Sequence, residues 1–122
     1  MTVIGAINHI DAIKPNTYNL TEKIRWLSML DGLIKAEIID SHEGGESVEY
    51  TGYNDSSIAI ELLVPAPYDD IYIKWLEAQI DYANGEYGKY NNSITMFNNA
   101  YLTFEKYYHR THLPKQKAIT NW

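Results

Sequence analysis

An uninterrupted seam of apolar and aromatic side chains runs through the second half of the chain. Its members are spaced alternately by three and four residues, which is the spacing of one face of an α-helix. They are Ile73, Leu76, Ile80, Ala83, Tyr87, Tyr90, Ile94, Phe97, Tyr101, Phe104 and Tyr108. The phase continues through Gly85 and Gly88 without a slip. It therefore favours one long helix over residues 68–110, kinked at the glycines if it is bent at all.

A straight helix of this length would extend beyond its own domain. From Asp70 to Tyr108 it would measure about 58 Å, whereas a compact chain of this size has a radius of gyration of ~14 Å. Either another subunit covers the exposed seam, or the helix breaks near Asn84 and Gly85 and folds back as a helical hairpin. Glycine costs about 1 kcal/mol in a helix interior relative to alanine, which keeps the hairpin open as an alternative. We expect the continuous helix, and with it a homo-oligomer.

The first half of the chain predicts one further helix after an irregular arm. Residues 1–19 contain Pro15 and a polar run, which is typical of an arm ending in a turn. Asn19 with Glu22 three residues later forms a helix N-cap pattern, although Thr21 is an alternative cap. An apolar stripe then predicts a helix over residues 20–43, with Gly44 and Gly45 as its stop. The stripe consists of Leu20, Ile24, Trp26, Leu27, Leu30, Leu33, Ile34 and Ile38.

Between the two helices the apolar period changes from helical to alternating. Residues 46–64 carry apolar side chains at every second position on either side of a turn-forming run, which indicates a short β-hairpin or, alternatively, an ordered loop laid over the helices. Pro65 and Pro67 then lead into the second helix. The predicted fold is mainly α in a single domain, residues 1–122, with the N-terminal helix packed on the long C-terminal helix.

Composition excludes several classes of protein. The chain has no cysteine, so disulfides and thiolate metal sites are ruled out. Polar residues interrupt the first fifteen positions, so we expect neither a signal peptide nor a membrane span, and an intracellular protein. Sixteen acidic residues against ten basic ones give a net charge of −6, which argues against nucleic acid as the primary ligand.

Charge is distributed unevenly, because no acidic residue follows Glu105. The last seventeen residues form a candidate basic tail that carries four basic side chains. These are Lys106, Arg110, Lys115 and Lys117. They either complement the negative end of a helix dipole or dock on an acidic neighbour, and local contact with packaged DNA is a further option.

The residues that carry chemistry do not form a catalytic motif. Of the four histidines only His109 and His112 lie close in sequence, no carboxylate follows them, and Pro114 ends the helix, so a zinc site there is not expected. The acidic pair at Asp69 and Asp70 suits a helix start better than a metal site. Phosphate loops, nucleophile triads and HExxH are absent. We therefore expect no enzyme activity, no catalytic or metal-binding residues and no cofactor.

The stretch from Tyr90 to Phe104 contains no charged residue, and amides occupy the side of the helix opposite the seam. Solvated helix faces usually carry Lys and Glu, so uncharged amides favour contact with another protein surface. The alternative is a partly buried helix in a compact monomer. The candidate interface comprises Tyr90, Asn91, Ile94, Phe97, Asn98, Tyr101, Phe104 and Tyr108.

Several runs of the sequence resemble a family of small proteins encoded by phages and prophages of Firmicutes, found among the head and connector proteins. These runs are Pro65–Asp70, Glu77–Glu86, Tyr90–Ser93 and Arg110–Pro114, with Lys14–Asn16, Ile24–Leu27 and Leu30–Gly32. Residues 44–61 have no counterpart in this resemblance.

The resemblance implies a structural protein of a tailed phage or prophage, a subunit of the head-tail connector. It further implies contacts with other copies and with portal or connector neighbours, first in the host cytoplasm and then in the virion. It transfers no catalytic residue. The rival hypothesis is a monomeric intracellular module of phage origin that binds one partner protein, as a regulator or assembly chaperone.

Overall fold

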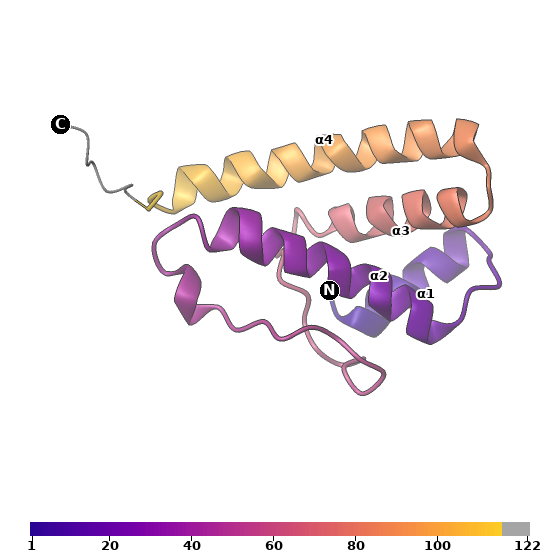
Figure 1. The fold of residues 1–122 in the computed structure, drawn as a ribbon, viewed down its shortest axis with the longest axis horizontal. Coiled ribbons are helices and arrows are strands. Elements are labelled where there is room, and N and C mark those ends of the chain that lie inside the picture. The colour runs from indigo at the N-terminus through magenta and orange to yellow at the C-terminus, as the bar shows by residue number, and fades with distance from the viewer. Residues whose placement is uncertain (116–122) are drawn as a thin grey trace.

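Four α-helices make up most of residues 1–115, the part of the chain that the computed structural model describes (Figure 1). They are α1 (Val3–Ile13), α2 (Leu20–Ile34), α3 (Asp70–Ala83) and α4 (Tyr87–Thr111). A π-helical turn, η1 (Lys35–Ile39), continues α2, and a short 3₁₀ turn, η2 (Gly45–Ser47), follows it. Within the described range the strand pairing consists of two isolated bridges, Thr2 with Glu61 and His42 with Pro114. The mainly helical prediction is confirmed.

Helix α1 corrects the prediction of an irregular N-terminal arm. The Thr2 side chain caps it by accepting a hydrogen bond from Gly5 N at 3.0 Å. One face is buried, formed by Val3, Ala6, Ile7 and Ile10. The polar residues that interrupt the sequence here occupy the opposite face, so they do not disturb the helix. Only the part after Ile13, around Pro15, is irregular as predicted.

Helix α2 begins as predicted, because the Asn19 side chain accepts a hydrogen bond from Glu22 N at 2.8 Å. Together with η1 it reaches Ile39, four residues short of the predicted end at 43. Most of the predicted stripe is buried, namely Ile24, Trp26, Leu27, Leu30, Ile34 and Ile38. Leu20 and Leu33 are instead about two-fifths exposed, because they lie at the margins of the buried face.

Residues 46–64 form an ordered loop, so the hairpin alternative is not supported. Some backbone groups of this loop pair with the start of the chain, and others close turns inside the loop, where Ser57 N donates to Asn54 O at 2.8 Å and Ile60 N donates to Ser57 O at 3.0 Å. Ile60 O and Ile58 O accept hydrogen bonds from Val3 N and Ile4 N, each at 2.9 Å, and Leu62 N donates to Met1 O at 2.9 Å. The first amides of a helix have no partner inside it. The alternating segment satisfies two of them at α1, which explains why a strand-like pattern makes no sheet.

The long helix breaks, which corrects the prediction of a continuous helix over 68–110. Asn84 caps the end of α3, Gly85 has a φ of +73°, and α4 begins at Tyr87 and runs back across α3 (Figure 1). Tyr82 O accepts a hydrogen bond from Gly85 N at 3.0 Å, which closes the last turn. Folding back lets the α3 and α4 parts of the seam cover each other. The second subunit that a continuous helix would have required is therefore not needed to bury the seam.

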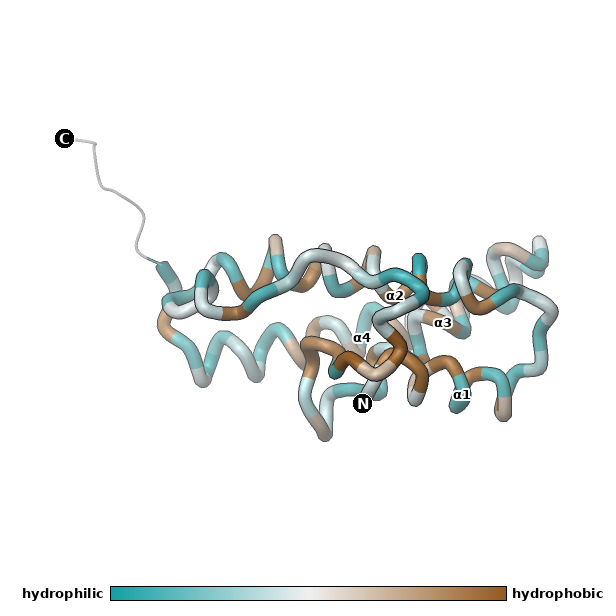
Figure 2. Tube along the Cα trace, turned by 90° about the horizontal axis from the view of Figure 1, so that it is seen from below, coloured by the Kyte–Doolittle hydropathy of each residue, from teal (hydrophilic) through white to brown (hydrophobic). Residues whose placement is uncertain are grey.

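Hydrophobic and hydrophilic positions alternate along each helix, which is the pattern that this packing uses (Figure 2). An ion pair with a buried carboxylate secures the hairpin to the N-terminal part. Lys14 Nζ lies 2.6 Å from Asp81 Oδ1, and Ser93 Oγ on α4 donates to Asp81 Oδ2 at 2.9 Å. Three segments distant in sequence therefore meet at one carboxylate.

Alanine substitutions at the two glycines of the hairpin are expected to have opposite effects. Gly85→Ala should lower the free energy of unfolding by about 1 kcal/mol, because a Cβ disfavours the left-handed conformation. Gly88→Ala should raise it by about 0.5–1 kcal/mol, because Gly88 lies in the first turn of α4 and its Cβ would meet nothing within 4 Å. Urea denaturation measures both, and effects of equal sign would contradict this account of the break.

Candidate functional site

Three of the predicted interface residues belong to the core of the chain itself. Phe97, Phe104 and Tyr108 are 5%, 1% and 8% exposed. The ring of Phe97 lies 4.9 Å from Trp75, and that of Tyr108 lies 5.0 Å from His42, measured between centroids. Assigning these three to a subunit interface was wrong, because the break at Gly85 turns this part of the seam inward.

The other predicted interface residues divide between the edge of the core and the surface. Tyr90, Ile94 and Tyr101 are half-buried. The hydroxyl of Tyr101 donates to Glu37 Oε2 at 3.0 Å and joins α4 to η1, while burial, together with this carboxylate, raises the pKa of the phenol. Asn91 and Asn98 are exposed on the outer side of α4, where the sequence placed them.

The outer α4 face is an exposed, uncharged helix surface. It consists of Asn91, Asn92, Thr95, Met96, Asn98, Asn99, Leu102 and Thr103. Met96 and Leu102 are about half exposed, at 51% and 49%. Helix α4 packs against α3 and η1 on its other side, and no described segment covers the outer face (Figure 1). A patch of amides, hydroxyls and two apolar side chains without a charge is typical of a protein contact surface.

A second exposed group lies at the tip of the helical hairpin. Tyr82 and Tyr87 are 57% and 60% exposed, and their ring centroids are 5.7 Å apart. Tyr90 lies 5.2 Å from Tyr82 by the same measure. The sequence assigned Tyr87 to the buried seam, but the turn at Gly85 leaves it outside. Exposed tyrosines in a cluster are enriched at protein interfaces.

Two of the four residues of the candidate basic tail belong to helix α4, and a third follows it directly. Lys106 and Arg110 are exposed residues of α4, and Lys115 lies just beyond its end, 3.7 Å from Glu46 Oε2. Lys117 lies outside the described residues. Arg110 and His109 stand in the last turn of α4, where positive charge complements the helix dipole.

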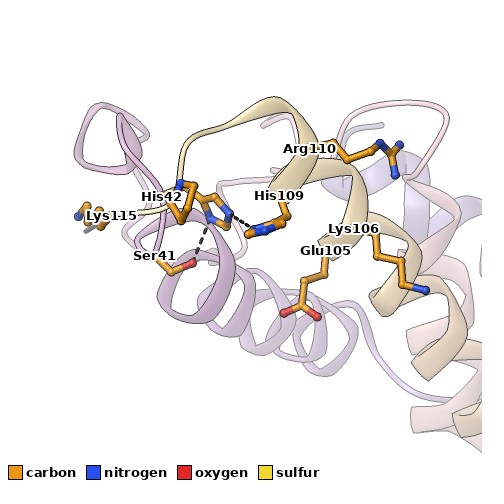
Figure 3. Close-up of a pocket in the computed structure, with 8 residues that line it drawn as sticks. Ser41, His42, Glu105, Lys106, His109, Arg110 and Lys115 are labelled. Carbon is orange, nitrogen blue, oxygen red and sulfur yellow. Dashed lines mark hydrogen bonds between the residues drawn. The ribbon is translucent and has the colours of Figure 1, made fainter. Parts of the chain in front are cut away.

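The chain following α4 returns to the end of η1 and borders a pocket (Figure 3). Lys115 N donates to Ser41 O at 3.0 Å, and Glu43 N donates to Leu113 O at 2.8 Å. The pocket measures about 720 Å³ and is lined by Ser41, His42, Glu105, Lys106, His109, Arg110, Pro114 and Lys115.

Two histidines from different elements meet beside this pocket. His42 is buried, and its Nδ1 lies 2.6 Å from Ile38 O. Because a carbonyl oxygen can only accept, Nδ1 donates its hydrogen to Ile38 O, and the opposite ring nitrogen is Nε2. That Nε2 lies 3.4 Å from His109 Nδ1. Sequence reasoning considered only His109 with His112, since 67 residues separate His42 from its neighbour in space. In the structure, the His112 ring stacks on Tyr108 at 3.8 Å.

Asp31 is a buried carboxylate that sequence reasoning did not single out. Its Oδ1 accepts from Tyr72 Oη at 2.6 Å, and its Oδ2 accepts from Leu63 N at 3.0 Å and from the Tyr53 hydroxyl. Burial raises the pKa of Asp31 above its usual value, and the hydrogen bonds offset part of this rise. The carboxylate fastens the 46–64 loop to α2 and α3. In the sequence, Asp31 could have been noticed as an acidic residue within the buried stripe of α2.

Comparison with known proteins gave no match to any family model, to any curated protein or to any solved structure. Within residues 1–115 no helix is both long and apolar enough to cross a membrane. In the same range no three side chains of the kinds that bind metals lie together in a position to hold an ion.

Proposed function

We propose that the protein is a non-catalytic structural subunit that associates with copies of itself through the outer α4 face. The observation that carries this proposal is the absence of charge on an exposed helix surface in a chain of net charge −6. From Asn91 to Thr103 this face runs about 18 Å along the helix. Water-exposed helices rarely lack charge over such a length.

A second copy is the occupant that this surface suits best. In a two-fold contact the same patch meets itself, so any charge on the patch would face a like charge. The outer α4 face avoids that repulsion. Asparagine amides both donate and accept hydrogen bonds, so a row of them can pair with an identical row. Met96 and Leu102 supply the apolar contact area.

The assembly we propose is the head-tail connector of a tailed phage or prophage, with portal or connector proteins as further neighbours. This rests on the resemblance of the runs at Pro65–Asp70, Glu77–Glu86 and Tyr90–Ser93 to phage head and connector proteins. Such a subunit would be made in the host cytoplasm and end in the virion.

Two carboxylates on the outer α4 face are expected to dissociate the oligomer. Asn98 and Leu102 are both exposed and one helical turn apart, so changing both to glutamate should leave the subunit folded and place like charges opposite each other. Light scattering on a size-exclusion column should show a defined oligomer for the wild type and a monomer for the variant. Circular dichroism checks that the variant is folded.

The matched control changes Asn8 and Ala12 on α1 to glutamate, which adds the same charge at the same spacing to another exposed helix surface. It should leave the oligomer intact. A wild type that stays monomeric at high concentration contradicts self-association and favours the rival, a monomeric module that binds one partner protein. Recovery of the chain in purified tailed particles then separates a virion subunit from an assembly chaperone that is absent from them.

A further inference from the structure

We propose that the hairpin tip of one copy docks on the basic α4 end of a second copy, so that the two α4 helices run antiparallel. The hairpin tip consists of Tyr82, Glu86, Tyr87, Gly88 and Tyr90. The basic α4 end consists of Lys106 and Arg110. These two groups lie at opposite ends of α4 (Figure 1). The inference rests on the proposed association through the outer α4 face and adds the direction in which two copies meet.

The outer α4 face continues into both groups. Residue 97 is the middle of the uncharged stretch, and Gly88 and Lys106 each lie nine residues from it, about 13.5 Å along the helix in opposite directions. The intervals of seven, four and seven residues keep one line on the helix surface, formed by Gly88, Thr95, Asn99 and Lys106. A two-fold axis at the middle of the face therefore brings Lys106 of one copy opposite Gly88 of an antiparallel second copy.

Charge decides between the two possible directions. Lys106 and Arg110 are exposed and form no ion pair with another described residue. In Figure 3 both extend from α4 in the same direction, away from His42. A parallel pair of helices would bring each of these cations against its own copy. The antiparallel direction separates the two basic ends by about 27 Å, well beyond the screening length of about 8 Å, and it opposes the helix dipoles.

The hairpin tip presents a surface that suits cationic side chains. Tyr82 and Tyr87 are 57% and 60% exposed, and the face of a tyrosine ring attracts lysine and arginine. Glu86 Oε2 lies 2.6 Å from Lys89 Nζ, so this pair is neutral and does not repel an arriving cation. A Cβ at Gly88 would meet nothing within 4 Å, which leaves open space where the lysine of the second copy arrives.

The contacts at the two ends enlarge the interface. The outer α4 face alone runs about 18 Å, whereas the contact from Gly88 to Lys106 runs about 27 Å. A stable interface buries about 800 Å² on each partner, which a single short helix face covers poorly. Two-fold symmetry forms the contact between tip and basic end twice. Helices that cross at about 20° keep both ends within reach of long side chains.

Disulfide trapping tests the direction, and the chain suits this test because it has no cysteine. Asn92 and Thr103 are exposed on the outer α4 face, on opposite sides of its middle. In the antiparallel pair, position 92 of one copy lies near position 103 of the other, so a mixture of Asn92→Cys and Thr103→Cys should oxidise to a mixed dimer. Each variant alone should not cross-link, because its two cysteines are about 15 Å or more apart and a disulfide needs Cα atoms within about 7 Å.

Variants of the two groups test the contact itself. Tyr87→Ala should weaken self-association at least about tenfold, because the cation loses its ring at two symmetric places. The double change of Lys106→Ala with Arg110→Ala should also weaken it, whereas in a parallel pair the same change would relieve repulsion and strengthen association. Analytical ultracentrifugation measures the dissociation constant, and melting temperatures show that each variant is folded. Met29→Ala is the matched control, because Met29 is 50% exposed on α2 and should leave the constant unchanged.

The outcomes separate this docking from the proposed function. Cross-linking of each cysteine variant alone, with tighter association of the double alanine variant, means parallel helices. That result overturns the docking and keeps the outer α4 face as the interface. An unchanged dissociation constant in Tyr87→Ala overturns the contact at the hairpin tip. A wild type that stays monomeric at high concentration overturns both the proposed function and the docking.

Discussion

Asp31→Ala is expected to lower the free energy of unfolding by about 3 kcal/mol. The change leaves three donors without their acceptor, namely the buried hydroxyl of Tyr72 and the partly buried hydroxyl of Tyr53 and amide of Leu63. Each unpaired donor costs about 1–3 kcal/mol, and the relief from burying a carboxylate offsets part of the sum. Urea denaturation followed by circular dichroism measures the difference.

Asp31→Asn is the matched control, because it keeps the shape and one acceptor oxygen and should cost clearly less than the alanine change. A Ser57→Ala variant tests the loop separately, since Ser57 is buried but holds only its own turn through Asn54. If Asp31→Ala unfolds at the urea concentration of the wild type, Asp31 does not fasten the loop to the helices.

The free energy of unfolding of the wild type relative to Asp31→Asn is expected to depend on pH, with a sign that follows from the pKa of Asp31. Burial raises the pKa of Asp31 in the folded protein above its value in the unfolded chain. The stabilising contribution of a group with a raised pKa is complete below the unfolded value, about 4 for Asp, and is lost as pH rises through the folded value. The stability of the wild type relative to Asp31→Asn should therefore fall as pH rises over this window. Taking the difference between the two proteins removes the contributions of the other titratable groups, because both proteins share them.

Phe104→Ala is expected to lower the free energy of unfolding by about 3–5 kcal/mol. Phe104 is 1% exposed and lies between Tyr68 of the segment before α3 and Tyr108 of its own helix, at ring centroid distances of 6.3 and 5.8 Å. Removing the ring leaves a cavity at the place where the C-terminal half of α4 meets the rest of the fold. The midpoint of thermal or urea unfolding reports the loss.

Leu102→Ala is the matched control, two residues away on the same helix and 49% exposed. It should change the stability of the subunit by no more than about 0.5 kcal/mol, since surface positions tolerate truncation. At concentrations where copies associate, Leu102→Ala should instead weaken the oligomer. A stability loss equal to that of Phe104→Ala would mean that the outer α4 face is buried within the subunit.

The apolar pattern predicted the buried faces well where helices were long. In α2 the burial of Ile24, Leu27 and Leu30 follows from their spacing, and the Asn19 cap follows from local chemistry. The pattern failed at α1, where a stripe of only four residues is interrupted by polar ones. It failed again in residues 46–64, where Leu62 and Val64 are buried but Ile58 and Ile60 are 37% and 48% exposed. Alternation also does not show which backbone groups pair.

Some features of the candidate sites could be predicted from the sequence, and others depend on the fold. The charge-free outer face was visible in the sequence, because charge can be counted along a helix whose buried side is known. The meeting of His42 with His109 was not visible, because it depends on how the end of α4 returns to the end of η1. The network at Asp31 was equally hidden, since its donors come from two segments distant from α2 in sequence, the 46–64 loop and α3.

The sequence by itself determined the helical class, most of the inward-facing helix positions and the uncharged outer surface, because these depend on local period and composition. The tertiary structure alone decided whether the seam of α3 and α4 is buried within one chain or between chains. The heptad phase is the same for a continuous helix and for a hairpin. The two differ only in a few dihedral angles at Asn84 and Gly85, and the free energy gained when α4 folds back onto α3 selects between them.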